Sequence, residues 1–169
     1  MAIITLNNNS LSSVTALPAG VGGKVLQVVS VTKDSTFTTT SSSFVDVTGL
    51  TASITPSSAS NKIAVFYNVS LSNTTSTAAT LTRLLRDSTP ISIGASGTGV
   101  QASGHVAVYN YNQGNVSISY LDSPSTTSAT TYKVQLSTES SNTATLNRGQ
   151  LTSDYGLTAS SITLMEVSA

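Results

Sequence analysis

A period of two in the large apolar side chains of the segment KIAVFYNVSLS constrains the fold more than any other feature of the chain. Every second residue in this segment is apolar and large: Ile63, Val65, Tyr67, Val69 and Leu71. Successive residues of a β-strand point to opposite faces, so a period of two places these side chains together on one face. The segment therefore predicts a strand over residues 61–72 that buries one of its faces.

Further segments have the length of strands, are rich in Val, Ile, Thr and Tyr, and are bounded by clusters of Gly, Pro, Ser and Asn. We expect strands at residues 25–33, 43–50, 79–88, 105–112, 116–123, 130–138, 144–149 and 161–169. Only the segment 79–88 would also suit a helix, because Leu81, Leu84 and Leu85 have helical spacing. Strands without intervening amphipathic helices predict an all-β, antiparallel sandwich or barrel.

One hairpin is predicted together with its register. If Gln113 and Gly114 form a two-residue turn, Ala107 pairs with Tyr120, Tyr109 with Ile118, and Tyr111 with Val116. Directly opposed residues share a face, and this register leaves mostly Asn and Ser on the other face. The apolar face would hold Ala107, Tyr109, Tyr111, Val116, Ile118 and Tyr120.

Three of these tyrosines allow two interpretations. Tyr109, Tyr111 and Tyr120 could form a stacking platform for a host glycan, or they could pack in the core or at a subunit interface. The predicted register favours packing, because it places them beside Val116 and Ile118.

The composition excludes several classes of protein. Ser and Thr number 31 and 27 among 169 residues, charged residues make up 8%, and the net charge is +0, which leaves no electrostatic footprint for nucleic acid or anionic lipid. Hydrophobic residues make up 38% of the chain and alternate, which favours a folded protein over a disordered one. Because the chain has no Cys, it has no disulfide or thiolate zinc site, and we expect oligomerisation to contribute stability.

No pattern in the sequence indicates an enzyme, a cofactor or a metal. His105 is the only histidine and no GxSxG motif accompanies it, so a catalytic triad is not expected. The acidic residues are scattered singly and form no calcium-binding loop. The glycine-rich GASGTG segment, residues 94–99, has no following Lys-Ser/Thr and leads into a predicted strand, so we interpret it as a loop between strands.

Several phrases of the sequence resemble a widespread family of virion proteins of tailed phages. They are GKVLQVVSVTKDSTFTTTSSSFVDVTGLTASITPSSASNKIAVFYNVSLS, LLRDSTPISIGASG, SATTYKVQLSTES and SITLMEV. Members of the family are small Ser/Thr-rich modules of tail fibres and capsid surfaces, particularly in phages of aquatic bacteria, including cyanobacteria. The resemblance implies a jelly-roll sandwich that forms a homotrimer, has no enzymatic activity and lies on the virion surface. It transfers no functional residues.

The polar leader of the chain is interpreted as a docking arm. Residues 1–23 lack the basic region and apolar core of a secretory signal, and no stretch is apolar enough to span a membrane, so we expect assembly in the host cytoplasm. Extended, such a segment reaches about 80 Å. Spaced apolar anchors and an amide run are the proposed contacts: Ile3, Leu6, Leu11, Val14 and Leu17, with Asn7, Asn8 and Asn9. A disordered tail is the alternative.

These expectations combine into a chain of two parts, an arm at residues 1–23 and a jelly-roll sandwich at residues 24–169. The trimer would serve as a short tail or head fibre or as a capsid decoration (cement) protein. Its partners would be other copies of the chain and either the major capsid protein or a tail or adaptor protein. A module that binds a host-receptor glycan is the alternative function.

Overall fold

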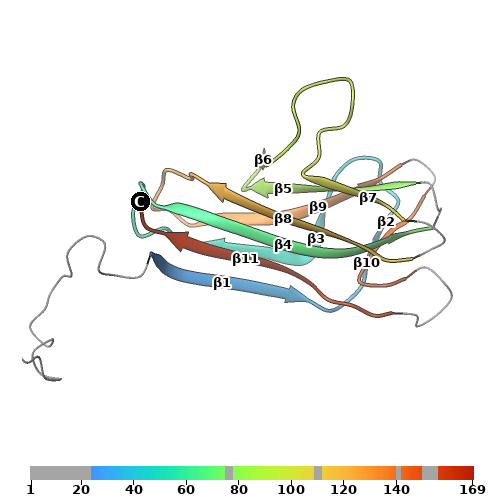
Figure 1. The fold of residues 1–169 in the computed structure, drawn as a ribbon, viewed down its shortest axis with the longest axis horizontal. Helices are drawn as coiled ribbons and strands as arrows, with labels where there is room; N and C mark the ends of the chain where they lie inside the picture. The colour runs from blue at the N-terminus through green and yellow to red at the C-terminus, as the bar shows by residue number, and fades with distance from the viewer. Residues whose placement is uncertain (1–23, 75–77, 109–111, 140–141, 150–155) are drawn as a thin grey trace, which may run out of the picture.

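The computed structural model describes residues 24–74, 78–108, 112–139, 142–149 and 156–169. The described residues form eleven strands and no helix (Figure 1). The strands are β1 (Val25–Lys33), β2 (Phe37–Thr39), β3 (Val45–Ile54), β4 (Lys62–Asn73), β5 (Ala79–Arg86), β6 (Thr89–Ile91), β7 (Gly104–Ala107), β8 (Gly114–Asp122), β9 (Thr130–Thr138), β10 (Ala144–Leu146) and β11 (Ser160–Val167). The predicted anchors of the arm lie outside the described residues, and so do Tyr109 and Tyr111.

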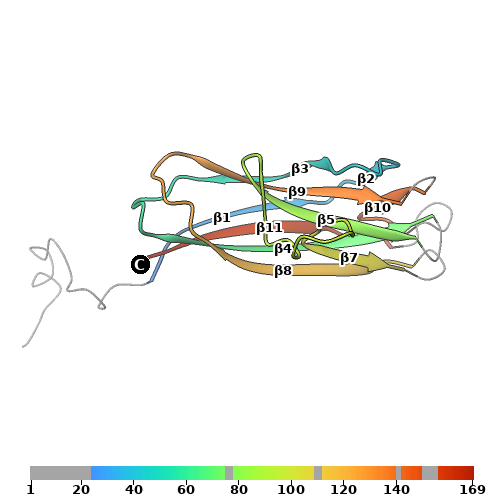
Figure 2. The ribbon, with the colours of Figure 1, turned by 90° about the horizontal axis from the view of Figure 1, so that it is seen from above.

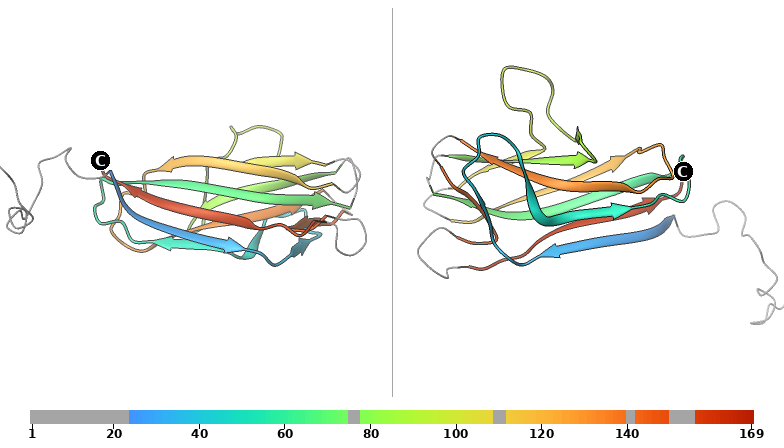
Figure 3. Two further views of the ribbon diagram at one scale, coloured as in Figure 1. Left: turned by 60° about the horizontal axis from the view of Figure 1, so that its bottom comes forward. Right: turned by 180° about the vertical axis from the view of Figure 1, so that it is seen from behind.

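The strands form two antiparallel sheets. In the six-stranded sheet the order is β1-β11-β4-β10-β2, with β8 on the other edge of β4, and in the five-stranded sheet it is β3-β9-β5-β6, with β7 also on β5. Figure 3 shows β8, β4, β11 and β1 side by side on one face of the molecule and β9, β5 and β3 on the opposite face. Seen from above, β3 and β9 lie on one side and β4 and β8 on the other (Figure 2). The predicted all-β, antiparallel sandwich is confirmed.

The core lies between the two sheets and confirms the alternation that the sequence predicts for β4. All five alternating side chains of this strand are buried: Ile63, Val65, Tyr67, Val69 and Leu71. They belong to one hydrophobic cluster with Leu84 of β5 and Tyr132 of β9.

A hydrogen bond also crosses the core, because the Tyr67 hydroxyl lies 2.8 Å from Oγ1 of Thr82 in the opposite sheet. Burial raises the pKa of Tyr67 to about 12, so this hydroxyl keeps its proton.

The strand boundaries agree with the sequence where the apolar pattern is long. β1 and β9 begin and end at the expected residues, and the segment 79–88, which would also suit a helix, contains strand β5. Two strands were not expected, β2 and β6. Each is three residues long, which is too short for a period of two to be recognised.

The predicted hairpin is wrong, although the predicted face of its second strand is right. β7 pairs with β5 and β8 pairs with β4, so the two strands belong to different sheets. On β8, Val116 is buried, and Ile118 and Tyr120 pack against the core, as the register placed them. Alternation determines which face of a strand is buried, but it does not determine which strand lies beside it.

Two glycines let β7 and β8 approach each other across the sandwich. A Cβ atom on Gly104 would lie 2.7 Å from Cγ1 of Val116, and one on Gly114 would lie 2.6 Å from Cγ2 of Val106 and 2.9 Å from Cγ1 of Val108. These distances are far below van der Waals contact, and branched Val side chains have few ways to move aside. A Cβ atom at either position would therefore force the facing Val side chains or the strands that carry them to shift.

We therefore expect Gly114→Ala to lower the free energy of unfolding by about 1–3 kcal/mol, the usual cost of overpacking. Urea unfolding followed by circular dichroism measures this change. Gly97→Ala is the matched control, because a Cβ there meets no atom within 4 Å. Its effect should stay within about 0.5 kcal/mol. Equal midpoints for the two variants would contradict the close approach.

Candidate functional site

Neither a metal centre nor a membrane-spanning helix is found in the part of the chain that the structure describes. No three His, Cys, Asp or Glu side chains come together there in a way that could hold a metal ion. No helix among the same residues is long and apolar enough to cross a membrane. His105 lies exposed on β7. Two buried carboxylates, one loop and one outer face are the features of the described residues that could form a site.

Glu166 of β11 is a buried carboxylate held by neutral donors. It accepts hydrogen bonds from the backbone N–H and the hydroxyl of Ser57, both at 2.7 Å, and from the side-chain amides of Asn61 and Gln27, both at 2.6 Å. Burial alone raises the pKa of Glu166, but the hydrogen bonds from Asn61, Gln27 and Ser57 outweigh it and hold the pKa at about 2. The carboxylate fastens β11, β1 and the β3–β4 connection together.

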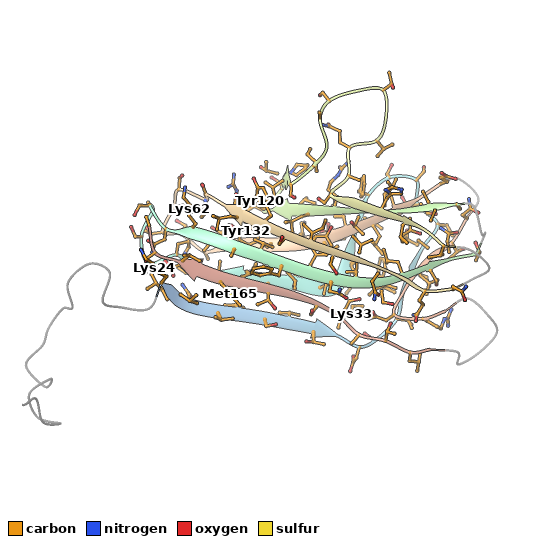
Figure 4. All side chains as sticks on the ribbon, viewed as in Figure 1. Lys24, Lys33, Lys62, Tyr120, Tyr132 and Met165 are labelled. Atoms are coloured by element: carbon orange, nitrogen blue, oxygen red, sulfur yellow. The ribbon has the colours of Figure 1, made fainter. Side chains whose placement is uncertain are left out.

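Asp122, the last residue of β8, is the second buried carboxylate. Its two oxygens lie 2.8 and 3.0 Å from Nη1 of Arg86 on β5, and it accepts a hydrogen bond of 2.6 Å from the Tyr132 hydroxyl on β9. Burial and the bond to Asp122 raise the pKa of Tyr132 well above its ordinary value. This cluster joins the two sheets at one end of the sandwich (Tyr132 is labelled in Figure 4). Both carboxylates therefore have structural roles.

The alternation of apolar residues marks both acids as buried, although neither is among the site residues predicted from the sequence. Glu166 follows Ile162 and Leu164 at every second position, and Asp122 follows Ile118 and Tyr120 in the same way. An acid on the apolar face of a strand is buried by alternation and needs donors around it. Its donors could not be named from the sequence, because Gln27 lies 139 residues from Glu166 and Arg86 lies 36 residues from Asp122.

The loop between β6 and β7, residues 92–103, rises from the body of the molecule (Figure 1). Its base is fixed by Arg83, which stacks 3.7 Å above the Phe44 ring and donates a hydrogen bond of 3.0 Å to the carbonyl of Gln101. The glycine-rich segment 94–99 lies in this loop, as the sequence predicted.

A pocket of about 380 Å³ lies against the same loop, lined by Leu81, Gln101, Ser103 and His105 together with small loop residues. The lining contains neither a carboxylate nor a Phe, Tyr or Trp ring. A glycan site of the kind that stacked tyrosines would form is expected to contain aromatic faces and carboxylates. Tyr120, the one described residue of that set, packs against the core rather than forming a surface platform.

The outer face of the six-stranded sheet carries a row of apolar side chains across four strands. Val28 of β1 pairs with Met165 of β11, Met165 with Ala64 of β4, and Ala64 with Leu121 of β8. Val28 is 54% exposed and Leu121 58% exposed. Leu26 and Phe66, also exposed, lie on the same strands close to this row. We call these residues the apolar patch: Leu26, Val28, Ala64, Phe66, Leu121 and Met165 (Met165 is labelled in Figure 4).

Phe66 stands between two shallow hollows of the apolar patch. One, of about 190 Å³, lies between Phe66, Ala64 and Leu121, where the small side chain of Ala64 leaves space. The other, of about 280 Å³, is lined by Phe66 and by polar residues that include Asn68 and Ser117. The half-exposed Phe66 ring thus lines a hollow on each side, and a partner surface of complementary shape would fill both hollows.

Three pairs of polar residues around the apolar patch form hydrogen bonds with each other. The hydroxyls of Ser30 and Thr163 lie 2.8 Å apart, and the Asn68 amide donates to the hydroxyl of Ser117. Lys62 donates a hydrogen bond of 2.7 Å to the hydroxyl of Ser123. These polar groups bond to one another, whereas no segment that the structure describes covers the exposed side chains of the apolar patch.

Comparisons with known proteins find little. No protein-family model matches the chain, and no curated protein does. Among solved structures, the chain is similar to the structure of infectious bursal disease virus Gx strain, with 11% sequence identity and a TM-score of 0.44. The match covers 85% of this chain and 36% of the viral chain, so this chain spans about a third of the length of the viral chain. At this identity and TM-score the likeness says nothing about function.

Proposed function

We propose that the chain is a non-enzymatic structural protein of a tailed-phage virion. Three copies form a jelly-roll appendage, which residues 1–23 attach to the particle as a short tail or head fibre or as a capsid decoration protein. The attached partner is the major capsid protein or a tail or adaptor protein.

The observation that carries this proposal is the order of the strands. Eight strands have four or more residues: β1, β3, β4, β5, β7, β8, β9 and β11. Among these eight, the six-stranded sheet contains the first, eighth, third and sixth in that spatial order, and the five-stranded sheet the second, seventh, fourth and fifth. This is the order expected when two Greek keys wind around each other, and it supports a jelly roll.

Jelly rolls serve in viral capsids, in lectins and in cupins. A cupin-like centre would lack ligands in the described part of the chain, which brings no three metal-binding side chains together. A lectin-like site would find no Phe, Tyr or Trp ring and no carboxylate in the pocket at the 92–103 loop. The virion role is favoured because it requires only stable outer faces, and the resemblance of several sequence phrases to phage virion proteins favours it too.

The position of residue 24 suits attachment by the segment that precedes it. The N–H of Ser168 donates a hydrogen bond of 2.8 Å to the carbonyl of Lys24, so the start of β1 and the C-terminus share one end of the sandwich (Figure 1). Residues 1–23 therefore connect to the folded domain at this end.

Two measurements test the proposal. Light scattering on the purified protein should give a mass of about three times the 17.2 kDa of one chain. Antibody labelling of purified phage particles, followed by electron microscopy, should place the protein on the particle surface. A stable species with the mass of one chain, or particles without the protein, would refute it.

The docking role of residues 1–23 has its own test. A chain without residues 2–23 should unfold at the same temperature and have the same assembled mass, because the core cluster is built from residues 29 onward. It should nevertheless be lost from purified particles, as an immunoblot against the full-length chain would show. Particles that retain the shortened chain at the full level would contradict the docking role.

A further inference from the structure

We propose that the apolar patch is the surface by which one copy of this chain binds a second copy. The inference rests on the proposed trimer and goes beyond it, because it identifies the face that the neighbouring copy covers. It assigns residues 1–23 no part in this contact.

The size of the apolar patch fits an interface between copies. Leu26 is 48% exposed and Phe66 43%, close to the values of Val28 and Leu121. The patch therefore presents on the order of 400 Å² of apolar surface, a size at which patches on single chains commonly mark a contact site. That is about half of the roughly 800 Å² that each partner contributes to an interface of standard size. Apolar surface makes up a little over half of such an interface, so the patch would supply most of its apolar part.

The charge of this face favours a second copy over a charged partner. Among the outward-facing residues of β1, β11, β4 and β8 that the structure describes, the charged side chain is Lys62, which is bound to Ser123. The chain as a whole has a net charge of +0. Identical copies thus meet without like-charge repulsion, and the face offers no charge that would select another partner.

The edge of the sheet adds a second reason for a copy to bind here. Of the described strands, only β11 pairs with β1, so the far edge of β1 carries backbone groups without a strand partner. Leu26 and Val28 of the apolar patch lie on this edge strand. An open edge beside exposed apolar side chains promotes association, and a closed ring of subunits covers it. The Phe66 ring, with a hollow on each side, would anchor the contact.

The absence of cysteine from the chain makes a direct test possible. Leu121→Cys places a single thiol in the apolar patch, and Val100→Cys places one in the 92–103 loop as a matched control. In the single chain these two positions are 58% and 63% exposed. Each full-length variant is first sized by light scattering and is then mixed with a maleimide dye, with labelling followed over time.

We expect the Leu121→Cys thiol in the assembled protein to react at least about tenfold more slowly than the Val100→Cys thiol, since an interface core excludes water and reagent. In denaturant the two should react equally fast. Equal rates in an assembled trimer would overturn the inference and leave the trimer intact. Protection of Leu121→Cys in a species with the mass of one chain would also overturn it, because a segment of the same chain would then cover the patch.

A second pair of variants tests the same surface through assembly. Val28→Asp should reduce the mass to that of one chain without changing the circular dichroism spectrum, because an exposed charge disturbs the contact and not the fold. Val100→Asp should leave the assembled mass unchanged. A trimeric Val28→Asp variant would refute the proposed contact alone. An unchanged protein with the mass of a single chain would refute the proposed trimer itself.

Discussion

Replacing Asp122 by alanine is expected to lower the free energy of unfolding by about 2–4 kcal/mol, because a buried ion pair that loses one partner leaves the other uncompensated. Asp122 is buried and accepts hydrogen bonds from Arg86 and Tyr132. Arg86 is 28% exposed, so water can compensate part of its charge, and the loss should fall below that of a fully buried pair. Urea unfolding at pH 7 measures the change.

The exposed ion pair between Asp46 and Lys133 supplies the control. Its N···O distance of 2.7 Å resembles the 2.8 Å between Arg86 and Asp122, but the Asp46 side chain is 48% exposed. Asp46→Ala should therefore cost less than about 1 kcal/mol, as exposed pairs do. Tyr132→Phe removes one hydrogen bond from the buried cluster and should cost about 1 kcal/mol. If Asp122→Ala is no more costly than Asp46→Ala, the cluster does not hold the two sheets together.

Glu166→Gln is expected to destabilise the protein by about 2–3 kcal/mol at pH 7 and to change its response to acid. In the unchanged protein, Ser57, Asn61 and Gln27 donate hydrogen bonds to the carboxylate. In the variant, these donors would face the NH₂ group of the substituted side chain, which is itself a donor. At least one of these donors would then be left without an acceptor. Thermal unfolding at pH 7 measures this part of the effect.

The acid response follows from the lowered pKa. Glu166 has a pKa of about 2 in the folded chain and an ordinary value of 4.5, so the folded state binds its proton more weakly than the unfolded state. Its contribution to stability is complete above pH 4.5 and is lost as the pH falls toward 2. The melting temperature of the unchanged protein should therefore fall more steeply across this window than that of Glu166→Gln.

Glu139→Gln provides the matched comparison, because Glu139 is exposed. Its melting temperature should follow that of the unchanged protein at every pH, within the effect of a surface substitution of about 0.5 kcal/mol. Parallel pH curves for Glu166→Gln and the unchanged protein would mean that the buried carboxylate is not the source of the acid response.

The local pattern of the sequence was sufficient to predict strands and their buried faces. Alternating residues of β4 and β8 enter the core as expected, for example Val65 and Val116, because the pleat of a strand requires successive side chains to point in opposite directions. The same rule predicts the boundaries of β1 and β9. It fails for β2 and β6, whose three residues carry too little pattern.

Strand pairing could not be predicted in this way. The hairpin proposed between the segments around Ala107 and Tyr120 matched apolar faces well, yet β7 and β8 pair with β5 and β4. Many registers of a Ser/Thr-rich chain match equally well locally. β7 and β8 do lie close together, at Gly104 and Gly114, but they meet as strands of opposite sheets and not as a paired hairpin.

The sequence by itself determined that this chain is a β protein, which residues its long strands bury, and that few charges are available for function. Only the tertiary structure decided what the remaining residues do. It brings donors to Glu166 and Asp122 from distant strands, and it aligns Val28, Met165, Ala64 and Leu121 into one exposed row. The physical reason is that side-chain alternation acts between neighbours in the chain, whereas a polar cluster or a surface patch depends on strand order and register across the sheet.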